Sequence, residues 1–70
     1  MWVISHHYSI NLDNCNYYRA ANSGESIADA TVFKMNNGRI VMMTGDYDTV
    51  REQIERAYRT PGQRTVVLQY

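Results

Sequence analysis

Two adjacent histidines and a single cysteine are the residues of this chain best suited to bind a metal ion. His6 and His7 are neighbours, and Cys15 is the one thiol. Zinc sites built from these residue types use paired ligands at short, characteristic spacings, and no such pairing is present here. We place the histidines at the end of a strand, where adjacent side chains point to opposite faces. We therefore expect no metal site, and we interpret Cys15 as a small, semi-buried hydrophobic residue.

Carboxylates and hydroxyls also lack the arrangement that catalysis needs. Asp46 and Asp48 stand at a spacing that suits the first turn of a helix, whose N-terminus favours acidic residues. Glu52 and Glu55 are typical ion-pair partners on a helix surface. No serine stands in a nucleophile-elbow context, and no glycine-rich loop is present to hold a phosphate. We therefore predict that the chain is not an enzyme and has neither catalytic residues nor a cofactor.

Aromatic residues are the most distinctive part of the composition. Six tyrosines, one tryptophan and one phenylalanine stand among 70 residues, more than so small a core must hold. Tyrosine, tryptophan, methionine and arginine are enriched in binding patches. Two interpretations stay open: the tyrosines form a binding surface, or they form the amphipathic rim of a small core.

Length and charge restrict the class of protein further. Seventy residues make one domain, covering residues 1–70, with a core worth only about 3–5 kcal/mol, so a partner subunit would help. Seven basic and seven acidic residues balance, which argues against both a DNA-clamping protein and an acidic nucleic-acid mimic. The lone cysteine, together with no predicted signal peptide or membrane span, favours a reducing cytoplasm.

The strongest local signal is a β-hairpin from Thr31 to Thr44. Asn37-Gly38 stands between two strand-like runs, and this dipeptide is typical of a two-residue type I′ turn. Such a turn would pair Met35 with Ile40, Phe33 with Met42, and Thr31 with Thr44 on one core face, with Val32 opposite Met43 and Lys34 opposite Val41 on the other.

That register makes both faces of the hairpin apolar. Val32, Val41 and Met43 would lie on the second face, where a one-layer sheet should be polar. We therefore expect another layer, or another copy of the chain, to cover this face.

The other elements complete an α+β domain. A helix follows Gly45 with Asp46, Asp48 and Thr49 as candidate caps, and it ends at Thr60-Pro61-Gly62. Its apolar stripe contains Tyr47, Val50, Ile54, Ala57 and Tyr58, and the spacing pairs Glu52 with Arg56 and Glu55 with Arg59. Strands are expected at Trp2–Ser5, Tyr8–Leu12, Asn16–Ala20 and Arg64–Tyr70. We predict the order βββ-ββ-α-β, with about 4–6 strands in one mainly antiparallel sheet and the helix packed on it.

A resemblance supports this layout. The segment Ile10-Asn-Leu-Asp-Asn14, followed by an Asn-Gly hairpin and a short amphipathic helix, resembles small bacterial and phage proteins of the FlbD-type and LytTR-type layouts. This chain departs from them through Trp2-Val-Ile and the C-terminal strand, and it lacks the basic loops of a LytTR-type DNA reader. The resemblance implies a cytoplasmic bacterial or phage setting.

We hypothesise a non-enzymatic protein–protein interaction module, a homodimer that also binds a host protein. By analogy, small phage or mobile-element inhibitors of host defence, such as anti-CRISPR proteins, are of this kind. The residues expected to contact a partner or a second copy are Val32, Val41, Met43, Tyr17, Tyr18, Arg19, Val67 and Tyr70. Two alternatives stay open: a small nucleic-acid-binding transcriptional regulator, and a homodimer that binds a small ligand between protomers lined by Trp2 and the tyrosines. No membrane partner is expected.

Overall fold

The computed structural model describes residues 1–22, 24 and 29–69, and it confirms the α+β class and the predicted order of elements. The described residues form six strands, one α-helix and one short 3₁₀ helix. The elements are β1 (Trp2–Ile4), β2 (Ser9–Asn11), η1 (Leu12–Asn14), β3 (Cys15–Ala20), β4 (Ala30–Met35), β5 (Ile40–Thr44), α1 (Tyr47–Arg59) and β6 (Thr65–Val67).

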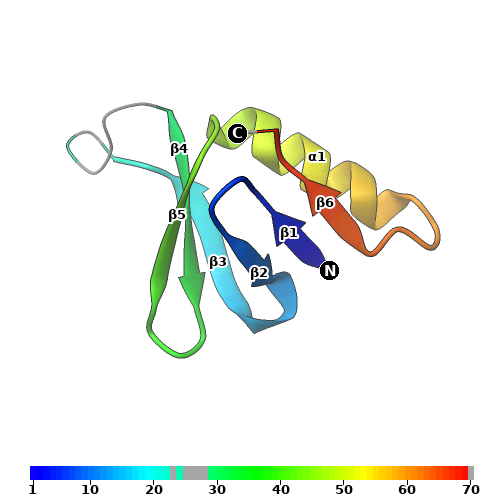
Figure 1. The fold of residues 1–70 in the computed structure, drawn as a ribbon, viewed down its shortest axis with the longest axis horizontal. Helices are drawn as coiled ribbons and strands as arrows, with labels where there is room; N and C mark the ends of the chain where they lie inside the picture. The colour runs from blue at the N-terminus through cyan, green and yellow to red at the C-terminus, as the bar shows by residue number, and fades with distance from the viewer. Residues whose placement is uncertain (23, 25–28, 70) are drawn as a thin grey trace.

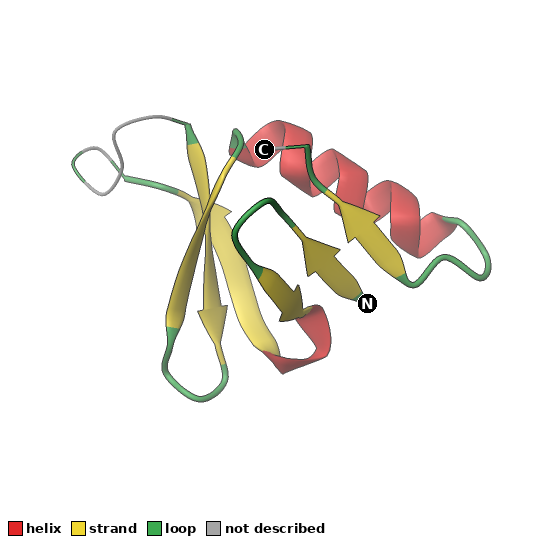
Figure 2. Ribbon diagram, viewed as in Figure 1, coloured by secondary structure: helices red, strands yellow, loops and turns green. Residues whose placement is uncertain are grey.

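The strands form two sheets of three rather than the one sheet predicted (Figures 1 and 2). The first sheet has the order β2-β1-β6, and the second has the order β3-β4-β5. All neighbours are antiparallel except β1 and β6, which run parallel, so that a strand near the start of the sequence lies beside one near its end. The η1 turn separates the sheets, because it redirects the chain between β2 and β3, and the Asn11 side chain caps it by accepting from the Asp13 N–H.

The β4–β5 hairpin is present, but its predicted type I′ turn is wrong. Gly38 has a positive φ of +90°, whereas Asn37 does not. A type I′ turn requires positive φ at both positions, so the loop instead contains the three residues Asn36–Gly38. The Met35 N–H donates to the Arg39 carbonyl at 2.8 Å, and the Gly38 N–H donates to the Met35 carbonyl at 3.0 Å. The extra loop residue shifts the register by one position.

This shift exchanges the faces of β5. Phe33 lies opposite Val41 and Thr31 opposite Met43, so these β5 residues point inward, while Ile40 and Met42 lie on the outer face with Val32. Met43 is 1% exposed and Ile40 is 58% exposed, which is the reverse of the prediction. The inference that the hairpin carries apolar residues on both faces therefore holds, but with Ile40 and Met42 in place of Val41 and Met43.

Helix α1 covers the inner face of the first sheet. Asp46 caps it, because its carboxylate accepts from the Thr49 N–H at 3.1 Å, and Thr60 follows its last residue as predicted. One stripe of the helix is buried against the strands and carries Val50, Ile54 and Ala57. The core cluster contains Val3, Ile10, Leu12, Phe33, Met43, Val50, Ile54, Ala57, Val66 and Leu68.

The surface of the helix follows the prediction in part. Glu52 pairs with Arg56 at 2.9 Å as predicted. Glu55 pairs with Arg51 at 3.0 Å instead of with Arg59, whose guanidinium donates to the Glu55 backbone carbonyl. Arg51 and Arg59 each stand four residues from Glu55, and the Glu55 carboxylate pairs with Arg51.

Candidate interaction surface

The outer face of the first sheet, the side turned away from α1, is an exposed apolar surface. Trp2 and Ile4 alternate with the buried Val3 along β1, and Ile4 lies beside Val67 in the register with β6. Trp2 is 47% exposed, Ile4 37% and Val67 64%. Ile4 and Val67 are register partners on neighbouring strands about 5 Å apart, and Trp2 lies two residues from Ile4 on the same face of β1, so these three side chains form one patch. We call this patch, Trp2, Ile4 and Val67, the outer face.

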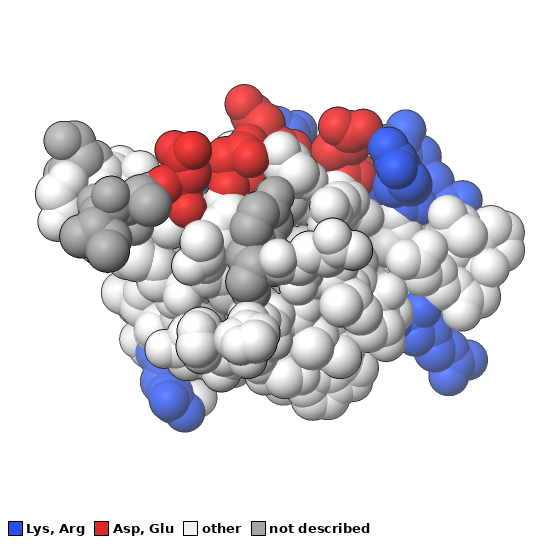
Figure 3. All heavy atoms as spheres, turned by 45° about the horizontal axis from the view of Figure 1, so that its top comes forward, with Lys and Arg blue, Asp and Glu red and all other residues white. Residues whose placement is uncertain are grey.

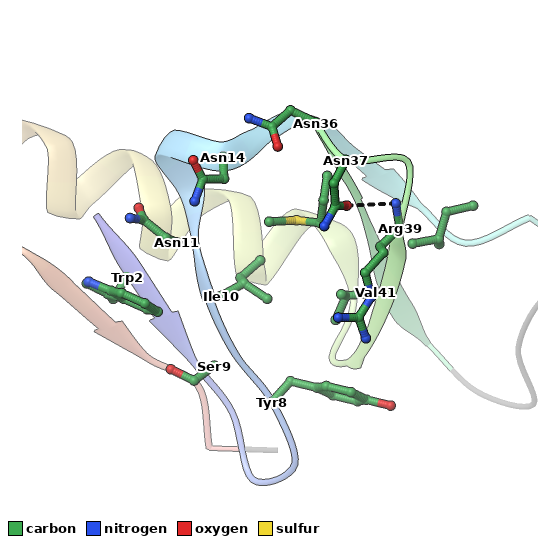
Figure 4. Close-up of a pocket in the computed structure, with 12 residues that line it drawn as sticks. Trp2, Tyr8, Ser9, Ile10, Asn11, Asn14, Asn36, Asn37, Arg39 and Val41 are labelled. Atoms are coloured by element: carbon green, nitrogen blue, oxygen red, sulfur yellow. Dashed lines mark hydrogen bonds between the residues drawn. The ribbon is translucent and has the colours of Figure 1, made fainter.

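A pocket of about 420 Å³ adjoins this patch between β2 and the tip of the β4–β5 hairpin (Figure 4). Trp2, Ser9 and Asn11 lie on one side of it, and Arg39 and Val41 lie on the other. Its complete lining consists of Trp2, Tyr8, Ser9, Ile10, Asn11, Asn14, Met35, Asn36, Asn37, Arg39, Ile40 and Val41. The size lies in the range of pockets that hold ligands or anchoring side chains.

The polar groups of the pocket are amides, a hydroxyl and one guanidinium. Among the described residues that line it there is no carboxylate, so Arg39 is the single charged side chain. Two of the asparagines are committed to holding loops: Asn37 Oδ1 accepts from the Arg39 N–H at 2.9 Å, and Asn11 Oδ1 accepts from the Asp13 N–H. The Asn36 N–H donates to the Asn14 carbonyl at 2.8 Å and ties the hairpin tip to η1. Hydrogen bonds therefore hold the hairpin tip that forms one side of the pocket, and Arg39 gives the pocket a positive charge.

Charge is sparse around the outer face. Figure 3 shows that charged side chains gather over α1 and at the two ends of the molecule and leave a broad uncharged area between them. On the helix, Arg56 pairs with Glu52 as predicted, and Arg51 pairs with Glu55 in place of the predicted Arg59. The bond from Glu55 raises the pKa of Arg51. These arginines therefore present little net positive charge to a nucleic acid.

Six of the eight predicted interface residues fall into three groups: buried or partly buried, exposed, and outside the described residues. Met43 and Val32 are each 1% exposed, and Val41 is partly buried against the core. Tyr17 is 52% exposed on the outer side of β3, and Val67 belongs to the outer face. Tyr70 lies outside the described residues.

The other two predicted residues lie on opposite sides of β3. Tyr18 points inward and stacks on Phe33, with ring centroids 5.5 Å apart, and burial raises its pKa. Arg19 is half-buried and donates to the Ala20 carbonyl. The predicted set is thus not one surface. The register error explains Val41 and Met43, whereas Val32 lies on the outer side of the second sheet and is nevertheless buried.

Residues that the sequence analysis left out make up most of the surface. Ile4, Arg39 and Ile40 were not predicted as interface residues, and Trp2 was considered only as a ligand contact. The uninterrupted apolar run Trp2-Val-Ile4 was the available signal, since a strand that is apolar at every position has two apolar faces.

The candidate metal ligands lie apart from this surface. His6 and His7 are both exposed in the connection between β1 and β2, not on a strand as predicted, and their rings meet edge to face at 4.9 Å. Within the described part of the chain, no three His, Cys, Asp or Glu side chains gather closely enough to hold a metal ion. The Cys15 thiol donates to the Tyr17 carbonyl, and burial raises its pKa. A raised pKa keeps the thiol protonated and lowers its reactivity.

Comparisons with known protein families, curated proteins and solved structures find no match to this chain. Among the residues that the structure describes, no helix combines the length and apolar character needed to cross a bilayer.

Proposed function

We infer that this chain is a protein–protein interaction module that binds its partner through the outer face and the adjoining pocket. One observation carries the proposal: Trp2, Ile4 and Val67 lie side by side and exposed on a sheet whose opposite face already packs against α1. Exposed apolar residues scattered singly are common, but a contiguous patch with a polar rim is typical of an interface. Trp2, Tyr8 and Arg39 at the pocket are of the residue types that dominate binding energy.

The small size and the resemblance to small phage proteins support an inhibitor of a host protein as the biological form of this activity. A second copy of the chain is the other partner predicted from the sequence. Light scattering on the free protein separates the two, because self-association through the outer face gives the mass of a dimer. A monomer mass assigns the outer face to a different protein.

The test of the proposal is binding by matched surface variants. The partner is captured from the natural host, purified and titrated against wild-type protein, Ile4→Ser and Val67→Ser. Tyr58→Ser is the control, because Tyr58 is 62% exposed on α1, away from the outer face. We expect the two outer-face variants to bind at least about tenfold more weakly and the control to bind like wild type. Equal binding by all variants would refute the proposal, and a steep loss of binding with salt would favour a nucleic acid instead.

A further inference from the structure

The outer edge of β5 presents unpaired backbone groups to the pocket. The bond from the Met35 N–H to the Arg39 carbonyl fixes which β5 residues are bonded to β4: Arg39 and, two and four residues on, Val41 and Met43. The N–H and carbonyl of Ile40 therefore point the opposite way, because these groups alternate in direction along a strand. In the described part of the chain, no group bonds to the Ile40 backbone.

The outer edge of β2 presents the same kind of groups from the other side. The Ser5 N–H donates to the Tyr8 carbonyl at 2.7 Å, and the Leu12 N–H donates to the Met1 carbonyl at 2.8 Å. Residues 8, 10 and 12 therefore bond toward β1, and the backbone of Ser9 points away from it. Ser9 has no backbone partner among the described residues, and both Ser9 and Ile40 line the pocket.

Two open strand edges that border one pocket identify the shape of its occupant. Unpaired N–H and carbonyl groups at a sheet edge are satisfied best by another extended chain, which brings alternating donors and acceptors. The pocket also lies where the two sheets separate (Figure 4), so an added strand would continue one of them.

The charge of the pocket identifies the side chain that the occupant should carry. The Arg39 guanidinium makes no hydrogen bond or ion pair within the described residues, and no carboxylate lines the pocket with it. Arginine binds a carboxylate through two parallel hydrogen bonds, which are about twice as strong as neutral ones. A single arginine is too little positive charge for a nucleic-acid strand, whose binding uses several phosphate contacts.

We propose that the pocket binds an extended segment of a protein partner by strand addition, with an Asp or Glu side chain of that segment on Arg39. This inference rests on the proposed function and specifies the chemistry of the partner. Trp2 and Tyr8 pack against the apolar side chains of the same segment. An acidic residue flanked by β-branched or aromatic residues is the sequence pattern that fits.

The probe is a short capped peptide of alternating threonine and valine with one central glutamate, titrated into isotope-labelled protein and followed by NMR. Two matched peptides serve as controls: one has glutamine in place of glutamate, and one is N-methylated at alternate backbone nitrogens. We expect amide shifts and slower solvent exchange at Ser9 and Ile40. The glutamine peptide should bind about tenfold more weakly, and the N-methylated peptide should not protect these amides.

The Arg39→Gln variant completes the test. It should bind the glutamate and glutamine peptides equally, because the charge that distinguishes them is gone. The proposal fails if the glutamate peptide causes no shifts, if both peptides bind wild type equally, or if the shifts appear only at the open edge of β6. Concentration-dependent shifts at Ser9 and Ile40 without peptide would assign the edge to a second copy and also overturn it. If the peptides do not bind while Ile4→Ser and Val67→Ser still weaken binding of the partner, the strand-addition proposal is refuted and the proposed function is supported.

Discussion

The outer apolar residues of the two sheets differ in how far they are exposed to solvent. In the second sheet, Val32 is 1% exposed and Met42 is partly buried, although both lie on the side turned away from the core cluster. In the first sheet, Ile4 and Val67 occupy the equivalent side at 37% and 64% exposure. An apolar residue on an outer face is thus no sign of a binding site by itself. Shelter separates Val32 and Met42 from Ile4 and Val67, although Ile40 and Tyr17 are exposed on the outer side of the second sheet as well. The first sheet is distinguished by exposed apolar residues that are register partners on neighbouring strands, and this contiguity points to it as the surface available to a partner.

The largest predicted effect is a difference in stability between substitutions of an inner and an outer residue of β5. Met43→Ala should lower the free energy of unfolding by about 2–5 kcal/mol, because it opens a cavity in the core. Met42→Ala, one position away and partly exposed, should cost clearly less. Urea unfolding of the two variants measures the difference. Equal losses, or a larger loss for Met42→Ala, would contradict the register that pairs Met43 with Thr31.

The next prediction compares the outer faces directly. Val32→Ala removes two buried methyl groups and should cost about 1–2 kcal/mol. Val67→Ala makes the same chemical change at an exposed position and should stay within about 0.5 kcal/mol. Thermal unfolding of both variants tests the contrast. If Val67→Ala is as destabilising as Val32→Ala, Val67 is buried from solvent too, and the outer face is then no more exposed than the outer side of the second sheet.

A third prediction concerns the turn that assigns residues to faces. Gly38→Ala should cost about 1 kcal/mol or more, because alanine is strained at a φ of +90°. A Cβ atom at Gly38 would meet nothing within 4 Å, so the cost is one of backbone conformation alone. The control is Asn36→Ala in the same exposed loop, which should change the unfolding free energy little. An unchanged stability in Gly38→Ala would contradict the turn.

The loop length of this turn is also a feature that could not be predicted from the sequence. Alternation, capping residues and Thr60-Pro61-Gly62 were enough for the order of the elements. Of the predicted apolar stripe of α1, Val50, Ile54 and Ala57 are buried, whereas Tyr58 is 62% exposed. Asn37-Gly38 located the hairpin but not its loop length, because the same dipeptide serves a two-residue turn and a three-residue loop. One extra residue moved Met43 from the expected binding face into the core.

The division into two sheets depends on contacts between residues distant in sequence. The parallel pairing of β1 with β6 joins residues near the two ends of the chain, and no local pattern specifies it. The same pairing places Ile4 beside Val67 and so creates the outer face. The pocket likewise depends on how the hairpin tip is held near η1 through Asn36 and Asn14. These features could not be read from spacing, whereas the apolar character of Trp2-Val-Ile4 could.

The smallest predicted effect tests the cap of the helix that covers the inner face of the first sheet. The hydrogen bonds from Thr49 lower the pKa of Asp46 in the folded protein, so folding favours the ionised carboxylate. Its contribution to stability is therefore complete above the ordinary aspartate pKa of about 3.9, and it is lost as the pH falls through the lowered folded value. The comparison is with Asp46→Asn, which keeps a capping oxygen without the titration. Urea unfolding from neutral to acidic pH should show wild type losing stability relative to Asp46→Asn. A difference between the two proteins that stays constant with pH would show that the charge on Asp46 does not hold this end of α1, and the inner face would then depend on apolar packing alone.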